Sequence, residues 1–312
     1  MKPLYILERG KISRDRNTIF FENNQIKIKY PIKDVDSIFF LNETSINSKL
    51  LGLLSQNEIT AHFFGHYGDY KGSFIPEKNR DGKLLLLQLK SFEKRIYFAK
   101  EIVCGSIHNM RKILLKYKLK EYAKKLENLT KKIPNTINKI LSIEAMARKI
   151  YYDSFKQIIK NKDFKLKKRT YNPPKDEINA LISFLNTLLY NVVLSEIYKT
   201  RLDPVISYVH EPSNRLSLQY DIADIFKPII VDRLLFTLIN KDIIKKSDFC
   251  NLKINKDTLK KIIKMFDERL NKTIKINEKE SYSYKYLIRR ECFKIINHIE
   301  KNQDYKSFKV WW

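Results

Sequence analysis

Two aspartates and a histidine lie close together in one stretch of the chain, HEPSNRLSLQYDIADIFKPIIVD. A helix starting at about Ser217 would place Asp221 and Asp224, three residues apart, on one face beside an apolar stripe. Like charges at that spacing repel each other, so a bound cation would stabilise them. His210 precedes this helix in a proline-containing turn, from which its imidazole could reach the same carboxylates. Histidine and carboxylate ligands together suit Mg²⁺ or Mn²⁺ better than a structural zinc, which prefers cysteine.

Each candidate residue also has an ordinary explanation. An acidic pair on a helix commonly faces water, and Lys227 is spaced to pair with Asp224. Glu144 lies in the apolar stretch KILSIEAMARKI, where a carboxylate needs a partner, and Arg148 four residues later can supply an ion pair. From the spacing alone, a metal site and a set of ion pairs therefore both remain open.

The charge balance indicates an anionic partner. The 312 residues include 61 Lys or Arg and 35 Asp or Glu, a formal net charge of +26, which exceeds what solubility requires. Nucleic acid is the leading candidate. A lysine-rich, glycine-poor composition also accompanies AT-rich genomes, so part of the excess has a second explanation.

Cysteine usage and hydropathy bear on the compartment. Cys104, Cys250 and Cys292 are odd in number and form no CxxC pair, which argues against a disulfide framework and a zinc knuckle. The first residues contain no apolar run of signal-peptide length, and no window has the composition of a membrane span. We expect a cytoplasmic protein with no membrane partner.

The elements that must position these residues change character along the chain. Residues 1–75 alternate polar and apolar positions in short β-prone runs, interrupted by one short helix in INSKLLGLLSQNE. The polar stretch PEKNRDGK, residues 76–83, is the expected linker. Residues 84–312 follow a helical period. The predicted fold class is α+β: an N-terminal β-rich, sandwich-like domain followed by an all-α catalytic domain.

Two predictions concern the helical half. A long helical region from Leu84 to Leu126 should bury one apolar stripe, and the helix from Ile178 to Tyr198 is apolar nearly all round and should be central. Its asparagines, Asn179 among them, need partners if they are buried, and we expect them to tie loops to the core. The predicted stripe consists of Leu85, Leu89, Phe92, Ile96, Ala99 and Val103.

A basic loop, FKLKKRTYNPP, precedes the central helix. Basic residues interleaved with an aromatic residue suit a nucleic-acid backbone. Lys167, Lys168 and Arg169 are therefore DNA-binding candidates, together with Arg215 and Tyr220, which lie beside the acidic pair.

Several phrases of the sequence resemble a known family. They are HYGDYKGSF, IEAMARKIYY, RTYNPPKDEINALISFLNTLLYNVVLSEIYKTRLDP, VHEPSNRLSLQYDIADIFKPIIVDR, SYSYKYLIRRECFK and YKSFKVWW. Together they resemble the first-numbered CRISPR-associated protein, an integrase and endonuclease of spacer acquisition, in its subtype I-B form. In that family the metal ligands match Glu144, His210 and Asp224 here, with Asp221 as a further acidic residue at the catalytic site. The position of Asp224 is often glutamate in relatives.

The resemblance implies an activity and an assembly. A prespacer 3′-hydroxyl would attack a phosphodiester at the leader–repeat junction of a CRISPR array, with Mg²⁺ or Mn²⁺ as cofactor. It further implies binding of double-stranded or branched DNA and a homodimer through the N-terminal domains. Two such dimers would be bridged by a dimer of a small ferredoxin-like partner to form a heterohexamer.

Two other functions remain possible from the sequence. A metal-dependent nuclease could use the same residues to hydrolyse branched DNA, with water replacing the 3′-hydroxyl. A basic, non-catalytic scaffold that binds nucleic acid would show the same charge and would not respond to metal.

Overall fold

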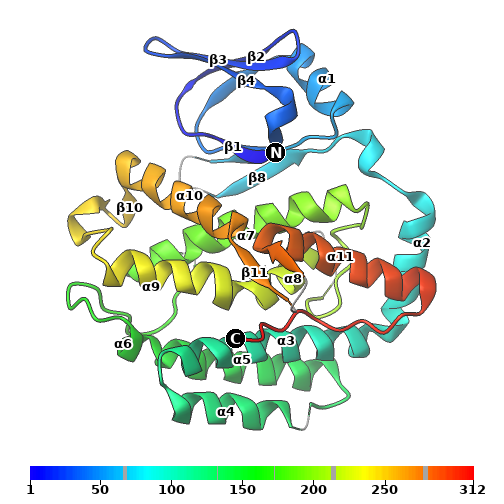
Figure 1. The fold of residues 1–312 in the computed structure, drawn as a ribbon, viewed down its shortest axis with the longest axis vertical. Helices are drawn as coiled ribbons and strands as arrows, with labels where there is room; N and C mark the ends of the chain where they lie inside the picture. Colours follow the sequence, from blue (N-terminus) through cyan, green and yellow to red (C-terminus); the bar gives the residue numbers. More distant parts are fainter. Residues whose placement is uncertain (66–68, 132, 172, 212–215, 277–279) are drawn as a thin grey trace. The chain divides into compact units, whose positions relative to one another are not determined.

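The computed structural model describes residues 1–65, 69–131, 133–171, 173–211, 216–276 and 280–312. The chain forms two compact units, the first comprising Met1–Gly82 and Ile197–Leu202 and the second Lys83–Glu196 and Asp203–Trp312. The first unit is rich in strands and the second is mainly helical (Figure 1). The α+β prediction is therefore confirmed. The units divide at a point inside residues 76–83, where a 3₁₀ turn, η2 (Glu77–Asn79), precedes the first helix of the second unit.

Two four-stranded sheets make up most of the first unit. One sheet has the order β1-β5-β7-β8, in which β1, β5 and β7 are parallel and β8 is antiparallel to β7. The other has the order β4-β3-β2-β6, with β6 parallel to β2 and the remaining pairs antiparallel. The strands are β1 (Lys2–Ile6), β2 (Gly10–Asp15), β3 (Thr18–Glu22), β4 (Lys27–Pro31), β5 (Val35–Phe40), β6 (Thr44–Ile46), β7 (Thr60–Phe64) and β8 (Tyr70–Phe74).

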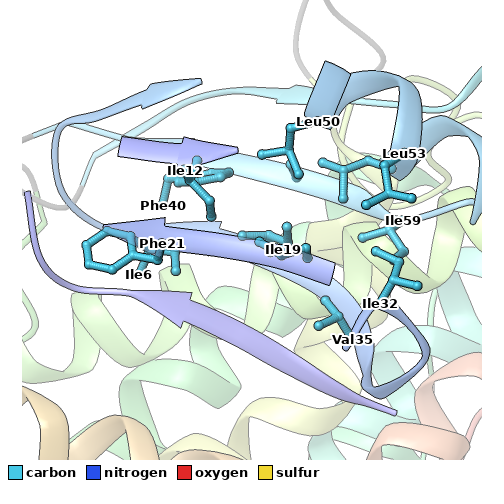
Figure 2. Packing of buried hydrophobic residues seen from close by; sticks show 13 residues of the cluster. Ile6, Ile12, Ile19, Phe21, Ile32, Val35, Phe40, Leu50, Leu53 and Ile59 are labelled. Atoms are coloured by element: carbon cyan, nitrogen blue, oxygen red, sulfur yellow. The ribbon is translucent and has the colours of Figure 1, made fainter. Parts of the chain in front are cut away.

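The two sheets share one apolar core, as in a sandwich. Ile12 and Ile19 from one sheet and Ile6 from the other belong to the same buried cluster (Figure 2). The helix α1 (Ser48–Gln56) adds Leu50 and Leu53 to that core. Its first turn is capped by the Asn47 side chain, which accepts a hydrogen bond from the Leu50 amide at 3.0 Å. The period-two pattern and the interrupting helix were thus predicted correctly.

The second unit is built from ten helices among its described residues, with two short hairpins. The hairpins pair β9 (Phe249–Cys250) with β10 (Lys253–Ile254), and β11 (Thr273–Lys275) with β12 (Ser281–Ser283). The helices are α2 (Gly82–Ser91), α3 (Arg95–Lys116), α4 (Lys120–Thr130), α5 (Ile137–Asp153), α6 (Phe155–Ile158), α7 (Glu177–Lys199), α8 (Leu218–Lys227), α9 (Arg233–Asn240), α10 (Lys256–Asn271) and α11 (Tyr284–Lys301). A π-helical turn, η4 (Pro228–Asp232), joins α8 to α9.

The predicted stripe along residues 84–126 is wrong in its first half. A 3₁₀ turn, η3 (Phe92–Lys94), separates α2 from α3 and changes the phase between the two helices, because a 3₁₀ helix has 3.0 rather than 3.6 residues per turn. Leu89 of α2 is therefore out of line with the buried face of α3 and is 52% exposed, and Ile96, in the first turn of α3 itself, is 38% exposed. Leu84, Gln88 and Ser91 are buried in α2 instead, whereas the later stripe residues Ala99 and Val103 are buried as predicted.

The expectation that no window has the composition of a membrane span is wrong for α7, which has the required length and hydropathy. Its burial, however, is that of a core helix. Within its most apolar window, 78% of the residues are buried in the folded protein. Asn179 near its first turn behaves as predicted, since its side chain donates to the Lys168 carbonyl at 2.9 Å and accepts from the Thr170 amide at 2.9 Å. The loop before α7 is thereby tied to the core.

Candidate active site

The helix α3 supports the two helices that carry the candidate carboxylates. Both α5, with Glu144, and α8, with Asp224, pack against it. Ser106 of α3 donates to the backbone carbonyl of Asp224 at 2.8 Å, and Asn109 donates to the carbonyl of Ile225 at 2.8 Å. The aspartate is therefore fixed to α3 through its own backbone.

Glu144 and Asp224 converge on one guanidinium group. Arg148 Nε lies 2.6 Å from Glu144 Oε1, and Arg148 Nη2 lies 2.6 Å from Asp224 Oδ2. Lys227 Nζ lies 2.5 Å from the other oxygen of Asp224. Both carboxylates are buried, at 8% and 4% exposure. The ion pairs that the spacing allowed are thus present, and the two carboxylates also face a common cation although 80 residues separate them in sequence.

Asp221 has a different role from Asp224. It is fully buried, and its Oδ2 accepts hydrogen bonds from the backbone amides of Tyr208 at 2.7 Å and Val209 at 2.9 Å. Its Oδ1 accepts from His210 Nδ1 at 2.6 Å. The His210 amide also donates to Oδ1, at 3.2 Å, so this carboxyl group acts as an acceptor throughout. Nδ1 is then the nitrogen that carries the proton, and Nε2 is the ring nitrogen left to bind a ligand. Asp221 therefore orients the imidazole.

Arg95 fixes the other side of the same turn. Its guanidinium donates to the carbonyls of Tyr208 at 2.7 Å, Val209 at 3.1 Å and His210 at 3.2 Å. It also pairs with Glu211 at 2.8 Å. The turn that presents His210 is therefore held by a carboxylate on its amides and a guanidinium on its carbonyls. Arg95 is 115 residues away in sequence, and no local pattern marks it as a partner of this turn.

The electric field of the carboxylates reaches His210. Burial lowers the pKa of His210, but the hydrogen bond to Asp221 and the charges of Asp221, Asp224 and Glu144 outweigh it, and the net pKa is raised. For Asp224, burial opposes ionisation, yet Arg148, Lys227 and His210 hold its pKa well below the ordinary value. Asp224 is therefore ionised at neutral pH, with His210 close enough to feel its charge.

Two further residues near the site, Asp232 and Tyr190, were not among the candidates predicted from the sequence. Asp232 is buried in η4, and burial raises its pKa to about 7 against the opposing effects of Tyr151 and the nearby cations Arg148 and Lys227. It follows Asp224 by eight residues, about two helical turns, and that spacing was the available signal. Tyr190 on α7 places its ring 4.7 Å from Lys227 Nζ.

The DNA-binding candidates do not lie in equivalent environments. Lys167 and Lys168 are exposed. Arg169 is committed to the protein, since it donates to Asn179 Oδ1 at 2.9 Å and to Ser183 Oγ at 3.0 Å, and stacks on Tyr171. Tyr220 is half-buried, and its ring centroid lies 5.9 Å from that of His210. Arg215 lies outside the described residues.

The donor set fits a divalent cation of the magnesium or manganese type. The two buried carboxylates can share one cation, and together with an imidazole they supply the oxygen and nitrogen ligands that Mn²⁺ prefers. The Nδ1 atom of that imidazole already donates to a carboxylate, as is typical of a metal-bound histidine. Within the described part of the chain, His, Cys, Asp and Glu side chains form no cluster of three arranged to hold a metal ion. The shared position is taken by the positive charge of Arg148.

Buried carboxylates beside an imidazole are typical of metal-assisted phosphoryl-transfer enzymes. Comparison with known proteins shows which family the chain is similar to. The family model for CRISPR associated protein Cas1 matches residues 4–268. A CRISPR-associated endonuclease Cas1 from Thermodesulfovibrio yellowstonii is 42% identical over 328 residues, covering 100% of both chains. A solved Cas1 protein from Thermotoga maritima has a TM-score of 0.90 at 34% identity, covering 98% of this chain and 100% of that one.

A third likeness concerns the fold alone. A casposase bound to its integration product has a TM-score of 0.85 at 17% identity, over 100% of this chain and 95% of that one. The family model and the relatives agree over nearly the whole sequence. The chain belongs to the Cas1 family of CRISPR-associated proteins.

Proposed function

We propose that the protein is a divalent-metal-dependent DNA integrase and endonuclease that inserts prespacer DNA into a CRISPR array. The proposal rests on the two buried carboxylates, Glu144 and Asp224. They contact one shared cation, and their charges raise the pKa of His210. Family membership supports the same conclusion, as does the likeness of fold to a casposase whose structure holds an integration product.

The bond changes follow from the chemistry of strand transfer. The 3′-hydroxyl of the prespacer gives up its proton as its oxygen forms a bond to the phosphorus at the leader–repeat junction, and the existing bond from that phosphorus to its 3′-oxygen breaks. The leaving oxygen takes up a proton and becomes a new 3′-hydroxyl. A bound Mg²⁺ or Mn²⁺ would supply charge stabilisation at the phosphoryl and leaving oxygens.

The residues of the chain have separate parts in this proposal. Glu144, Asp224 and His210 Nε2 would hold the cation, and Asp221 keeps the imidazole in the tautomer that exposes Nε2. Arg148 and Lys227 balance the buried negative charge in the absence of the ion. The lysines of the basic loop would contact phosphates without reading sequence.

The proposed partners follow from the family resemblance. We propose that the substrates are double-stranded or branched prespacer DNA and the CRISPR repeat. The N-terminal sandwich would form the homodimer, and a small ferredoxin-like CRISPR-associated dimer would bridge two such dimers into a heterohexamer. The subtype I-B assignment and a cytoplasmic location belong to the same proposal.

Strand transfer into a supercoiled repeat plasmid tests the proposed reaction. A 3′-hydroxyl DNA should be joined in the presence of Mn²⁺ and not with excess chelator. Glu144→Ala, His210→Ala and Asp224→Ala should each reduce joining at least about 10³-fold while leaving DNA binding within a few-fold, because the exposed lysines lie elsewhere. Joining that survives the chelator would overturn the metal requirement.

A matched control separates loss of the site from loss of charge. Glu127 is another helical glutamate paired with an arginine, Arg111 at 3.2 Å, but 49% of its side chain is exposed. Glu127→Ala should leave joining unchanged. A metal nuclease would instead release nicked or cleaved plasmid without covalent joining, and a scaffold would bind DNA without responding to metal; either outcome would replace the integrase proposal.

A further inference from the structure

A basic aromatic pocket lies in the helical unit and shares no lining residue with the carboxylate site. It has a volume of about 630 Å³, within the range of ligand sites, and is formed by the end of α3, the hairpin strand β11 and the last residues of the chain. Trp311 and Trp312, the only two tryptophans of the 312 residues, both line it. The pocket therefore concentrates a residue type that is otherwise absent from the protein.

The last residues are held firmly against α3. Val310 donates its amide to Asn109 Oδ1 at 2.9 Å, and its carbonyl lies 2.9 Å from His108 Nε2. Gly105 allows this close approach, since a Cβ there would overlap Ser307. The indole of Trp311 donates to the Lys275 carbonyl, and Lys112 Nζ donates to the Trp311 carbonyl at 2.8 Å. The pocket wall is thus a built feature of the fold.

The charges of the pocket all have one sign among its described lining residues. Five of them are basic and none is acidic: Lys112, Lys116, Arg233, Lys272 and Lys275. Burial lowers the pKa of Lys116, and the neighbouring Arg233, Arg269 and Lys272 lower it further. Cations that crowd one another in this way gain from a bound anion.

The aromatic rings decide which anion fits. Trp312 is covered by cations, with Arg233 Cζ 4.8 Å and Lys116 Nζ 5.3 Å from its ring. Trp311 keeps 59% of its surface exposed, which leaves a flat ring face beside Lys272 and Lys275. A nucleobase stacks on such a face while its phosphates meet the lysines, and this combination is typical of sites for single-stranded nucleic acid. An acidic peptide would satisfy the lysines but would leave the ring face unused.

We propose that this pocket binds a single-stranded segment of DNA, with one base stacked on Trp311 and its flanking phosphates held by Lys272, Lys275 and Lys112. The inference rests on the proposed DNA substrate and adds a second contact point for it, apart from the residues that would carry out strand transfer. Frayed or branched ends of a prespacer contain such a segment.

Tryptophan fluorescence reports directly on this pocket, because both tryptophans lie in it. Titrating the full chain with a short oligothymidylate, about eight nucleotides long, should quench the emission to saturation, and the affinity should fall as salt is raised. A blunt duplex of the same length should quench at least about tenfold more weakly, since its bases are already stacked. Quenching by polyglutamate but not by the oligonucleotide would assign the pocket to an acidic protein partner and overturn the proposal.

Charge-reversal variants locate the site. Lys272→Glu with Lys275→Glu changes two exposed side chains and should weaken oligothymidylate affinity at least about tenfold. The matched control, Lys261→Glu with Lys264→Glu on the exposed side of α10, makes the same charge change and should alter the affinity less than about threefold. Equal losses in the two double variants would show a diffuse charge effect and contradict a defined pocket.

Two further arms complete the test. Pyrophosphate that quenches with the affinity of the oligonucleotide would show a simple anion site and remove base stacking from the proposal. Glu144→Ala should still show full quenching although it cannot join DNA. If the unmodified chain shows strand transfer but no quenching, only the proposed single-strand pocket is contradicted. If it shows quenching but no metal-dependent strand transfer, only the proposed function is contradicted.

Discussion

His62 of the sandwich and the candidate carboxylates of the helical unit are buried in opposite ways. In the sandwich, His62 is fully buried, burial lowers its pKa to about 3, and its Nδ1 lies 2.6 Å from Ser73 Oγ. In the helical unit, Glu144 and Asp224 are buried as charges and are balanced by Arg148 and Lys227. A buried neutral histidine carries no charge that an ion could balance, whereas buried paired carboxylates can exchange one cation for another. On this argument the proposed chemistry belongs to the carboxylate pair and not to His62.

The largest effect that this comparison predicts is on Asp221, the buried carboxylate that orients His210. Asp221→Asn cannot accept all of the hydrogen bonds from Tyr208, Val209 and His210, so the imidazole should lose its orientation. We expect Mn²⁺ affinity, measured by calorimetry, to fall about 100-fold. Asp203→Asn is the control, because Asp203 Oδ1 accepts an amide bond from Val205 at 2.8 Å and an amide oxygen can replace it. Equal affinity in the Asp221 variant and the unmodified chain would argue against a positioning role.

The buried histidine of the sandwich makes the next prediction. Its folded pKa of about 3 lies below the unfolded value of 6.5, so the unfolded chain takes up the proton first and stability is lost as the pH falls from 6.5 towards 3. At about pH 5 the loss relative to about pH 7.5 should be about 2 kcal/mol, roughly 30-fold in the opening equilibrium. Amide hydrogen exchange in β5 and β7 measures it. His62→Gln should remove this part of the pH dependence; an unchanged pH profile in that variant would exclude His62 as its source.

Arg148 makes the exchange of cations testable. Removing its charge leaves Glu144 and Asp224 facing each other with Lys227 as the remaining close cation on Asp224. Arg148→Met should therefore tighten Mn²⁺ binding about tenfold, because the ion no longer competes with the guanidinium. Arg111→Met, which removes an arginine from an exposed pair with Glu127, is the control and should leave the affinity unchanged. Weaker metal binding in Arg148→Met would mean that the arginine supports the ion instead of competing with it.

The smallest effect concerns the exposed lysines of the basic loop. Lys167→Ala with Lys168→Ala should weaken DNA binding a few-fold and reduce the slope of log affinity against log salt by about 0.9 for each phosphate that is no longer neutralised. Joining of DNA that is already bound should be unaffected. An unchanged slope would show that these two lysines do not meet phosphates in the complex.

The spacing of apolar residues predicted many of the strands and helices, because it shows which side chains share one face of an element. The strands of residues 1–75, the start of α8 near Ser217 and the buried α7 all follow from the period of the apolar residues. The failure at Leu89 arises from the 3₁₀ turn η3, whose phase change has no clear sequence signal.

The residue types of the candidate site could be predicted from the sequence, but their hydrogen-bond and ion-pair partners could not. Spacing placed Asp221 and Asp224 on one helix, yet it could not show that one meets the backbone of a turn while the other meets Arg148. The role of Arg95 depends on which helices pack together, and that long-range interaction leaves no local pattern.

Glu144, Asp224 and His210 should together bind one divalent ion. Pulsed electron paramagnetic resonance of Mn²⁺ added to the metal-free protein tests it directly, since a coordinated imidazole gives a nitrogen hyperfine coupling. We predict one Mn²⁺ per chain with a nitrogen coupling that disappears in His210→Gln, and at least about tenfold weaker binding in Glu144→Gln and in Asp224→Asn. Bound Mn²⁺ without the nitrogen coupling, or binding unaffected by the two carboxylate variants, would contradict it.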